Sequence, residues 1–208
     1  MVTSDDVTFV AATPLEARAI RRHANGMRVV ECGIALAQTD ASDSRGPVIS
    51  CGLAGGLRND LATGTIVIAN KVRSPDGTVQ RCDEELIARL RDAAARLGRQ
   101  SVVAPLLTST TIVTGAERAT WAAEGYAAVD METGLLRAER LAAVRVILDT
   151  PQRELSPDWI NPARAMLRLS NWPQLFMLAR EAPRCADLAA RIAASAFTLK
   201  HAPPATGT

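Results

Sequence analysis

Several residue types and motifs are scarce or missing in this 208-residue sequence. Aromatic residues make up only 3% of the chain, which disfavours a surface that stacks on the bases of single-stranded nucleic acid. The net charge is +2, and acidic and basic residues are interspersed. No basic stripe is therefore available to bind nucleic-acid phosphates. We expect no nucleic-acid partner.

Motifs for metal, nucleotide and hydrolase chemistry are also missing. The chain has two histidines and neither HExxH nor GxSxG, so it lacks the usual signatures of zinc peptidases and serine hydrolases. It has neither GxGxxG nor a Walker lysine. The cysteines form no CxxC pair, which favours reduced, buried thiols over a zinc or redox centre. We expect no metal and no organic cofactor. The cysteines are Cys32, Cys51, Cys82 and Cys185.

No apolar run approaches the length of a membrane span, and "MVTSDDVTFV" has no basic segment followed by an apolar core. We therefore expect a cytoplasmic protein. Peripheral membrane contact is an alternative suggested by "NWPQLFMLAREAP", where Trp172 and Phe176 share a helix face. No basic face accompanies them, which favours packing into the core or a subunit interface.

Hydrophobic residues make up 48% of the chain and charged residues 22%, as in ordinary globular proteins. We expect one domain over residues 1–200 and a flexible tail over 201–208. Alternating strands and helices predict a three-layer α/β fold, with a central mixed, mostly parallel sheet flanked by helices. The predicted strands are 7–13, 27–33, 46–52, 64–74, 142–149 and one or two within 100–115. One predicted helix begins at Pro14. The others cover 82–98, 115–125 and 163–200, and the last of these is broken near "NWP" and "EAPR". Residues 34–44 are a further helical candidate.

Ligands bind at the carboxyl ends of strands in such sheets. The glycine-rich segment 52–56 follows a strand, where its N–H groups can surround an anion, although a tight turn is the simpler interpretation. Asp149 ends the apolar run 142–149, and burial there would raise its pKa so that it holds a proton near neutrality. Its alternative role is to cap the following loop, which is irregular over 150–162 and suits a pocket cover.

Three other carboxylates follow strands. Asp130 and Glu132 share a face if the strand continues and diverge if a helix begins there. A solvated helix N-terminus is the alternative for both. Glu16 lies in the first turn of a helix that has Thr13 as N-cap and Pro14 at its first position, so a purely structural role is open.

Four segments occur in an order that resembles the purine nucleoside phosphorylase and nucleosidase superfamily. They are "FVAATPLEARAI", "VISCGLAGGLRNDLATGTIVIAN", "YAAVDMETG" and "VRVILD", and the resemblance spans residues 7–150. The superfamily includes methylthioadenosine/adenosylhomocysteine nucleosidases. The remainder, with "RVILDTPQRELSPDW", is most similar to hopanoid-associated phosphorylases, which are thought to release adenine from adenosylhopane.

The resemblance implies specific roles. Asp149 would protonate the leaving purine at N7, Glu16 would lie near the nucleophile, and Glu132 would bind the ribose hydroxyls. Met131 would pack beside the sugar. The other residues expected to bind substrate are Thr13, Gly52, Leu53, Ala54, Gly55 and Val113.

The sequence also departs from the family pattern. Leu53 replaces a serine, and Arg118 aligns with a phenylalanine that stacks on adenine. "ECGIA" lacks the second glycine of a common turn, and the short stretch between Glu132 and Asp149 predicts a trimmed helix.

We predict a phosphorylase that cleaves the N-glycosidic bond of an adenine nucleoside, with adenosylhopane as substrate, phosphate as co-substrate and a homo-oligomeric state. Thr13 and Arg18 are candidates to hold phosphate, although Arg18 is also typical of a solvated surface residue. The alternatives are a nucleosidase that uses water and a non-catalytic nucleoside-binding protein.

Overall fold

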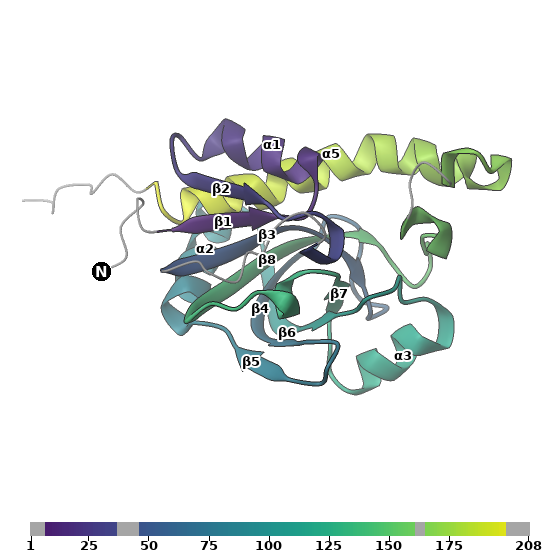
Figure 1. Cartoon of the computed structure of the whole chain (residues 1–208), viewed down its shortest axis with the longest axis horizontal. Coiled ribbons are helices and arrows are strands. Elements are labelled where there is room, and N and C mark those ends of the chain that lie inside the picture. The colour runs from purple at the N-terminus through teal and green to yellow at the C-terminus, as the bar shows by residue number, and fades with distance from the viewer. Residues whose placement is uncertain (1–6, 37–45, 161–164, 199–208) are drawn as a thin grey trace, which may run out of the picture.

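The computed structural model describes residues 7–36, 46–160 and 165–198, and it confirms the predicted α/β class, with helices flanking a mixed sheet (Figure 1). The predicted boundary between the domain and its tail lies outside the described residues. The strands are β1 (Thr8–Ala11), β2 (Arg28–Glu31), β3 (Pro47–Gly56), β4 (Ile66–Arg73), β5 (Val79–Arg81), β6 (Ser101–Thr108), β7 (Ala128–Asp130) and β8 (Arg140–Asp149).

Five strands pair in a closed ring. β3 pairs with β7, β7 with β6, β6 with β4, β4 with β8, and β8 again with β3. β1 and β2 extend the sheet beyond β3, and β5 extends it beyond β4. Most of these pairings are parallel, as predicted, but β8 runs parallel to β3 and antiparallel to β4. This position between two neighbours explains why residues 141–149 are all buried.

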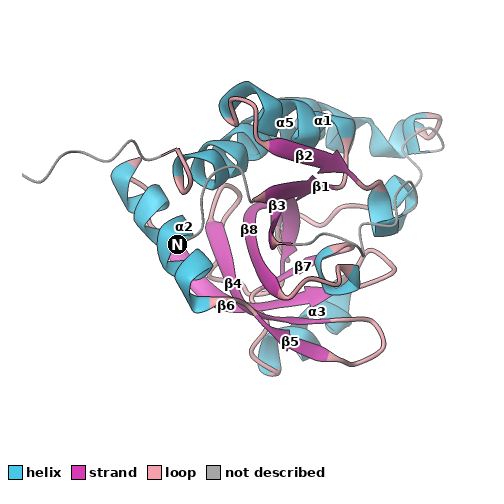
Figure 2. Ribbon diagram, turned by 60° about the vertical axis from the view of Figure 1, so that its left-hand side comes forward, coloured by secondary structure: helices cyan, strands magenta, loops and turns pink. Residues whose placement is uncertain are grey.

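The longer helices are α1 (Pro14–His23), α2 (Glu84–Arg96), α3 (Gly115–Ala123) and α5 (Trp172–Ser195), and the short 3-10 helices are η2 (Ile34–Leu36), η4 (Thr133–Leu135), η5 (Pro157–Ile160) and η6 (Leu169–Asn171). α1 and α5 lie side by side along one face of the sheet, whereas α3 lies on the opposite side of the molecule (Figures 1 and 2). α2 ends as predicted, because Gly98 adopts the left-handed conformation that closes a helix.

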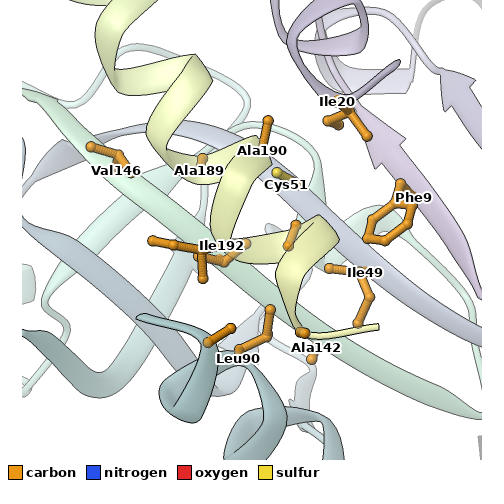
Figure 3. Packing of buried hydrophobic residues seen from close by; sticks show 14 of the residues in the cluster. Phe9, Ile20, Ile49, Cys51, Leu90, Ala142, Val146, Ala189, Ala190 and Ile192 are labelled. Atoms are coloured by element: carbon orange, nitrogen blue, oxygen red, sulfur yellow. The ribbon is translucent and has the colours of Figure 1, made fainter. Parts of the chain in front are cut away.

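The main hydrophobic core lies between this helical layer and the sheet. Small residues of α5, including Ala189 and Ala190, let the helix approach Ile49 and Cys51 on β3 (Figure 3). Ile192 is fully buried in the same cluster, and burial of such a side chain contributes about 1.5–3 kcal/mol. All four cysteines are unpaired and buried, as predicted.

Two local predictions were wrong. The segment 52–56 is no turn, because its backbone continues β3 in pairing with β8 and then β7. α5 begins at Trp172, which agrees with the predicted break at "NWP", but it runs without interruption through Pro183. Proline removes one intrahelical hydrogen bond, and packing of the neighbouring Ala182, Cys185 and Ala186 in the interior holds the helix together.

Two further predictions concern connecting segments. Between Glu132 and β8, where a trimmed helix was predicted, the structure has the three-residue η4, and residues 136–139 join η4 to β8. Of the helical candidate 34–44, residues 34–36 form η2 and the others lie outside the described residues. In the described part of the chain, no helix has the length and apolar character needed to cross a membrane.

Candidate functional site

A cavity of about 510 Å³ lies where β1, β3, β7 and β8 end, and α3 and α5 complete its wall. The sequence-predicted residues that line it are Thr13, Glu16, Leu53, Ala54, Gly55, Val113, Met131, Glu132 and Asp149. Gly52 does not line the cavity and lies behind Glu16. Arg18 is exposed and does not face the cavity. The predicted acid and the predicted sugar-binding carboxylate thus share one cavity.

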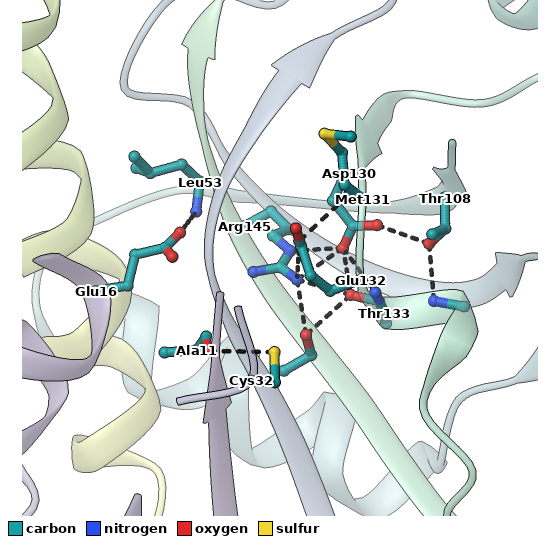
Figure 4. Close-up of polar contacts among 12 residues, drawn as sticks. Ala11, Glu16, Cys32, Leu53, Thr108, Asp130, Met131, Glu132, Thr133 and Arg145 are labelled. Atoms are coloured by element: carbon teal, nitrogen blue, oxygen red, sulfur yellow. Dashed lines mark hydrogen bonds and ion pairs between the residues drawn. The ribbon is translucent and has the colours of Figure 1, made fainter. Parts of the chain in front are cut away.

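Glu16 is fixed by the start of α1. Thr13 is the N-cap, and Oε2 of Glu16 accepts hydrogen bonds from the backbone N–H (2.9 Å) and the hydroxyl group (2.8 Å) of Thr13. Oε1 accepts a 2.7 Å hydrogen bond from the backbone N–H of Leu53 on β3 (Figure 4). This capping box holds a buried carboxylate between α1 and β3.

Asp130 forms a buried ion pair with Arg145, which lies at the centre of β8. Nε of Arg145 donates to Oδ2 of Asp130 (2.9 Å), and Nη2 lies 2.7 Å from the same oxygen. The hydroxyl groups of Thr108 and Thr133 also donate to Asp130 (Figure 4). Asp130 is therefore a structural partner of Arg145, because a buried carboxylate requires such compensation.

Glu132 has a different environment, although it is only two residues away. Within the described residues, its side chain accepts one hydrogen bond, from the backbone N–H of Met131 (3.3 Å). Burial and the nearby charge of Asp130 raise the pKa of Glu132 to about 8, even though Arg145 at 3.9 Å opposes the shift. A buried carboxyl group that has only one long hydrogen bond and faces a cavity is suited to bind a ligand's hydroxyl groups or positive charge.

Arg145 has one buried nitrogen without a partner. Nη2 donates to the hydroxyl groups of Ser50 (2.7 Å) and Thr133 (2.8 Å), but Nη1 has no hydrogen-bond partner in the described part of the chain. A Cβ atom on Gly52 would lie 2.7 Å from Nη1 and 2.1 Å from Oε1 of Glu16. The unpartnered donor and the Glu16 carboxylate therefore lie close to the same point.

Asp149 lies at the end of β8 beside Arg118 of α3. Nη2 of Arg118 donates to Oδ2 of Asp149 in a buried ion pair. Burial raises the pKa of Asp149, and the guanidinium group of Arg118 opposes this shift. The other nitrogens of Arg118 donate to the carbonyl oxygens of Val113 (2.8 Å) and Gly56 (2.7 Å).

Two arginines of the site had no predicted role. Arg145 lies within the run 142–149, which was interpreted as apolar. The available signal was a single charged residue inside a predicted buried strand, together with Asp130, an aspartate for which no partner had been predicted. Arg118 was noted only because it departs from the family pattern. In the structure it is 2% exposed and lines the cavity.

Part of the cavity wall is apolar. Leu15, Leu53, Leu155 and Leu178 pack around Leu148 and Ala182, and all of them line the cavity. Trp172 (47% exposed) and Phe176 (69% exposed) lie on α5 beside its cavity-facing residues. The apolar wall thus continues towards the outer surface of α5.

Solved structures of nucleosidases share this fold. A 5′-methylthioadenosine/S-adenosylhomocysteine nucleosidase mutant from Helicobacter pylori, with 5′-methylthioadenosine in its active site, has a TM-score of 0.69 and 14% identity over 91% of this chain and 96% of its own. The Colwellia psychrerythraea nucleosidase in complex with adenine gives 0.68 and 16% over 92% and 93%. A futalosine hydrolase mutant from Helicobacter pylori gives a TM-score of 0.69 and 12% identity over 91% of this chain and 97% of its own.

No curated protein sequence matches the chain significantly. The family profile described as phosphorylase superfamily matches residues 26–138, which is more than half of the sequence. Together with the fold and the position of the cavity, this match shows that the chain belongs to the phosphorylase superfamily.

Proposed function

We propose that this protein cleaves the N-glycosidic bond of a purine nucleoside. The observation that carries the proposal is that Glu16, Glu132 and Asp149 line one cavity from separate elements. Of the similar structures named above, the Helicobacter pylori nucleosidase mutant contains 5′-methylthioadenosine and the Colwellia psychrerythraea nucleosidase contains adenine. A non-catalytic nucleoside-binding protein has no evident need for a buried glutamate with so few hydrogen-bond partners as Glu132.

Breaking this bond leaves positive charge on the ribose and negative charge on the purine, as in related glycoside chemistry. Glu132 would accept hydrogen bonds from the ribose hydroxyls and stabilise the cation when its carboxyl group is ionised. Asp149 would face the leaving base. Its raised pKa is compatible with the proton-donating role that the family resemblance implied.

The surroundings of Glu16 favour water as the nucleophile. Glu16 lines the cavity, and the buried Nη1 of Arg145 lies behind it, beside the α-carbon of Gly52. The carboxylate of Glu16 would repel a phosphate dianion placed beside it, whereas a water molecule would meet no such repulsion. Hydrolysis is therefore our first hypothesis, and the phosphorylase predicted from the sequence is the second.

The apolar wall supports a nucleoside with a large apolar 5′ substituent, such as the predicted adenosylhopane. Leu155 follows β8 and Leu178 lies on α5, and both line the cavity. Burial of apolar substrate atoms there would contribute about 25 cal/mol per Å². The exposed Trp172 and Phe176 would extend this surface for a long substituent. The predicted homo-oligomeric state and cytoplasmic location stay predictions.

The test is to supply adenosine, methylthioadenosine and an adenosine derivative with a long 5′-alkyl group, each with and without phosphate, and to measure free base and sugar product. Free ribose in phosphate-free buffer would support the hydrolase. Release that requires phosphate and yields a ribose 1-phosphate would support the phosphorylase. Binding of these nucleosides without release of base by the wild-type protein would contradict both.

A further inference from the structure

We propose that Arg118 contacts the leaving adenine directly, donating a hydrogen bond to N7 while Asp149 accepts one from the 6-amino group. This inference rests on the proposed function and assigns the base-recognition contacts of the same cavity. Arg118 would then be a catalytic residue that stabilises negative charge on the departing base.

The hydrogen bonds of Arg118 leave N–H groups available. A guanidinium group has five N–H donors, one on Nε and two on each terminal nitrogen. Nε donates to Val113, Nη1 to Gly56 and Nη2 to Asp149. One further N–H therefore remains on each terminal nitrogen of a side chain that is held in place and lines the cavity.

Gly55 shows where such a donor meets the cavity. A Cβ atom on Gly55 would lie 3.4 Å from Nη2 of Arg118 and 3.1 Å from Oδ1 of Asp149. Oδ1 has no hydrogen-bond partner among the described residues, because the contacts of Asp149 with Arg118 and with the backbone N–H of Leu155 use Oδ2. A donor and an acceptor thus lie beside the same point, which a side chain at position 55 would fill.

This pair of groups matches one edge of adenine. That edge carries the N7 acceptor next to the N6 amino donor, whereas a 6-oxopurine carries two acceptors, N7 and O6. Ionised Asp149 beside Arg118 offers one acceptor and one donor, which complements adenine. A 6-oxopurine would place O6 against the Asp149 carboxylate unless that group were protonated.

Arg118 then stabilises the leaving base in place of the proton donation from Asp149 that the family resemblance implied. The C1′–N9 bond breaks, and its electron pair moves to the purine, whose negative charge is stabilised by the guanidinium group of Arg118. In the hydrolysis proposed above, a new bond forms between C1′ and the oxygen of water. The proton that this water loses balances the one that the purine anion takes up.

A second carboxylate supports Arg118. Oε1 of Glu154 lies 3.4 Å from Nε of Arg118 and accepts a 2.7 Å hydrogen bond from the backbone N–H of Gly115. The charged groups around Asp149 are thus Arg118 from α3 and, beyond it, Glu154 from the segment after β8. Arg118 keeps an acidic neighbour whichever protonation state Asp149 adopts.

The decisive measurement is the pH dependence of kcat/KM for adenosine and inosine with the wild-type protein. Above the pH range in which Asp149 titrates, inosine cleavage should fall about tenfold per pH unit, while adenosine cleavage should not share that fall. Titration of Glu132 affects both substrates through the ribose, so it cancels in their ratio. An unchanged adenosine-to-inosine ratio would overturn the proposal, because both substrates would then depend on protonated Asp149.

Variants provide a second test. Arg118→Met should lower kcat for adenosine about 10²-fold, the usual loss when one preorganised donor is removed, and weaken adenine binding measured by calorimetry. Arg118→Lys should restore part of both. Arg91→Met is the matched control, since Arg91 is exposed on α2 and does not line the cavity. Unchanged kcat and adenine binding in folded Arg118→Met would refute the contact.

Failure of this inference differs from failure of the proposed function. If the wild-type protein cleaves no purine nucleoside, the proposed function fails. If it cleaves adenosine with an adenosine-to-inosine ratio independent of pH, only the role of Arg118 fails. This wild-type comparison does not depend on whether the Arg118 variants fold.

Discussion

Gly52 of β3 and Arg145 of β8 are direct partners in the parallel register of their strands. Because Gly52 has no side chain, the guanidinium group of Arg145 and the carboxylate of Glu16 can both approach its α-carbon. Any Cβ at this position would overlap Oε1 of Glu16. The glycine therefore makes room for Arg145 directly behind the Glu16 carboxylate, the group that we propose lies near the nucleophile.

Substitution Gly52→Ala should disturb the nucleophile site first. The Cβ would lie 2.1 Å from Oε1 of Glu16, and the capping box prevents that carboxylate from moving freely. We expect the free energy of unfolding to fall by about 1–3 kcal/mol, as in other overpacked interiors, and kcat to fall by about 10²-fold or more. Chemical denaturation and steady-state kinetics measure these two effects.

The neighbouring Cys51→Ala is the matched control for this experiment. Cys51 is buried in the main core and does not line the cavity, so its shortening should lower stability while kcat stays close to that of the wild type. Equal kcat values for Gly52→Ala and the wild type would show that Glu16 and Arg145 need not keep this geometry.

Glu132 should control activity through its ionisation. Its pKa is raised to about 8, and the carboxylate is the form that stabilises a ribosyl cation. We therefore expect kcat/KM to increase as the pH rises through about 8 in the free enzyme. Glu132→Gln should lose about 10²-fold or more in kcat and show no such increase. A pH–rate profile that matches the wild type in shape would contradict this role.

The same residue should reduce stability at high pH. Because the folded protein raises the pKa of Glu132 above its unfolded value, the stability associated with the neutral form is complete below the unfolded pKa and is lost as the pH rises towards about 8. Glu132→Gln should therefore become more stable than the wild type as pH increases, by on the order of a few kcal/mol. The exposed Glu139→Gln is the control and should show no comparable gain.

Local sequence signals predicted much of the fold. The Thr13–Pro14–Glu16 pattern identified the start of α1, and the apolar run 142–149 identified β8. Strand pairing was harder to predict, because it depends on contacts between distant segments more than on local propensity. The closed ring of strands followed from no local pattern, and the glycines at 52–56 suggested a turn where two neighbouring strands keep the backbone extended.

In the candidate site, too, local sequence signals were visible, whereas contacts between distant residues were not. Carboxylates at strand ends were visible as Glu16, Glu132 and Asp149, since the fold class specifies where a cavity forms. Arg145 escaped notice because an arginine inside a buried strand acquires meaning only when Asp130 and Gly52 are brought next to it. Arg118 comes from a helix far from Asp149 in sequence, and only the tertiary structure pairs them.

Removal of Asp149 should affect substrates according to their leaving group. Asp149→Ala deprives a purine of its contact with the Oδ1 atom, so adenosine cleavage should fall about 10–10²-fold, as expected for the loss of a hydrogen bond to a charged group. A riboside with a p-nitrophenolate leaving group, which needs no such contact, should retain most of its rate. Parallel kinetics on the two substrates provide the measurement. An unchanged adenosine rate would exclude Asp149 from the mechanism.

The exposed apolar residues of α5 should matter only for nucleosides with a long 5′ substituent. Trp172 and Phe176 lie beside the cavity-facing Leu175 and Ala179. A substituent that extends past this wall would bury part of both aromatic side chains, at about 25 cal/mol per Å². The double substitution Trp172→Ser and Phe176→Ser should raise KM about tenfold for a 5′-alkyl adenosine and leave KM for adenosine unchanged.

The exposed Leu167, which does not line the cavity, gives the matched control Leu167→Ser. It removes an apolar side chain of greater exposure, so it tests whether general surface polarity alters KM. Equal increases of KM for the short and long nucleosides in the α5 variant would mean that the substitutions disturb the cavity itself. No increase for either would separate this surface from substrate binding, because a substituent in contact with it must lose affinity when its apolar partners are removed.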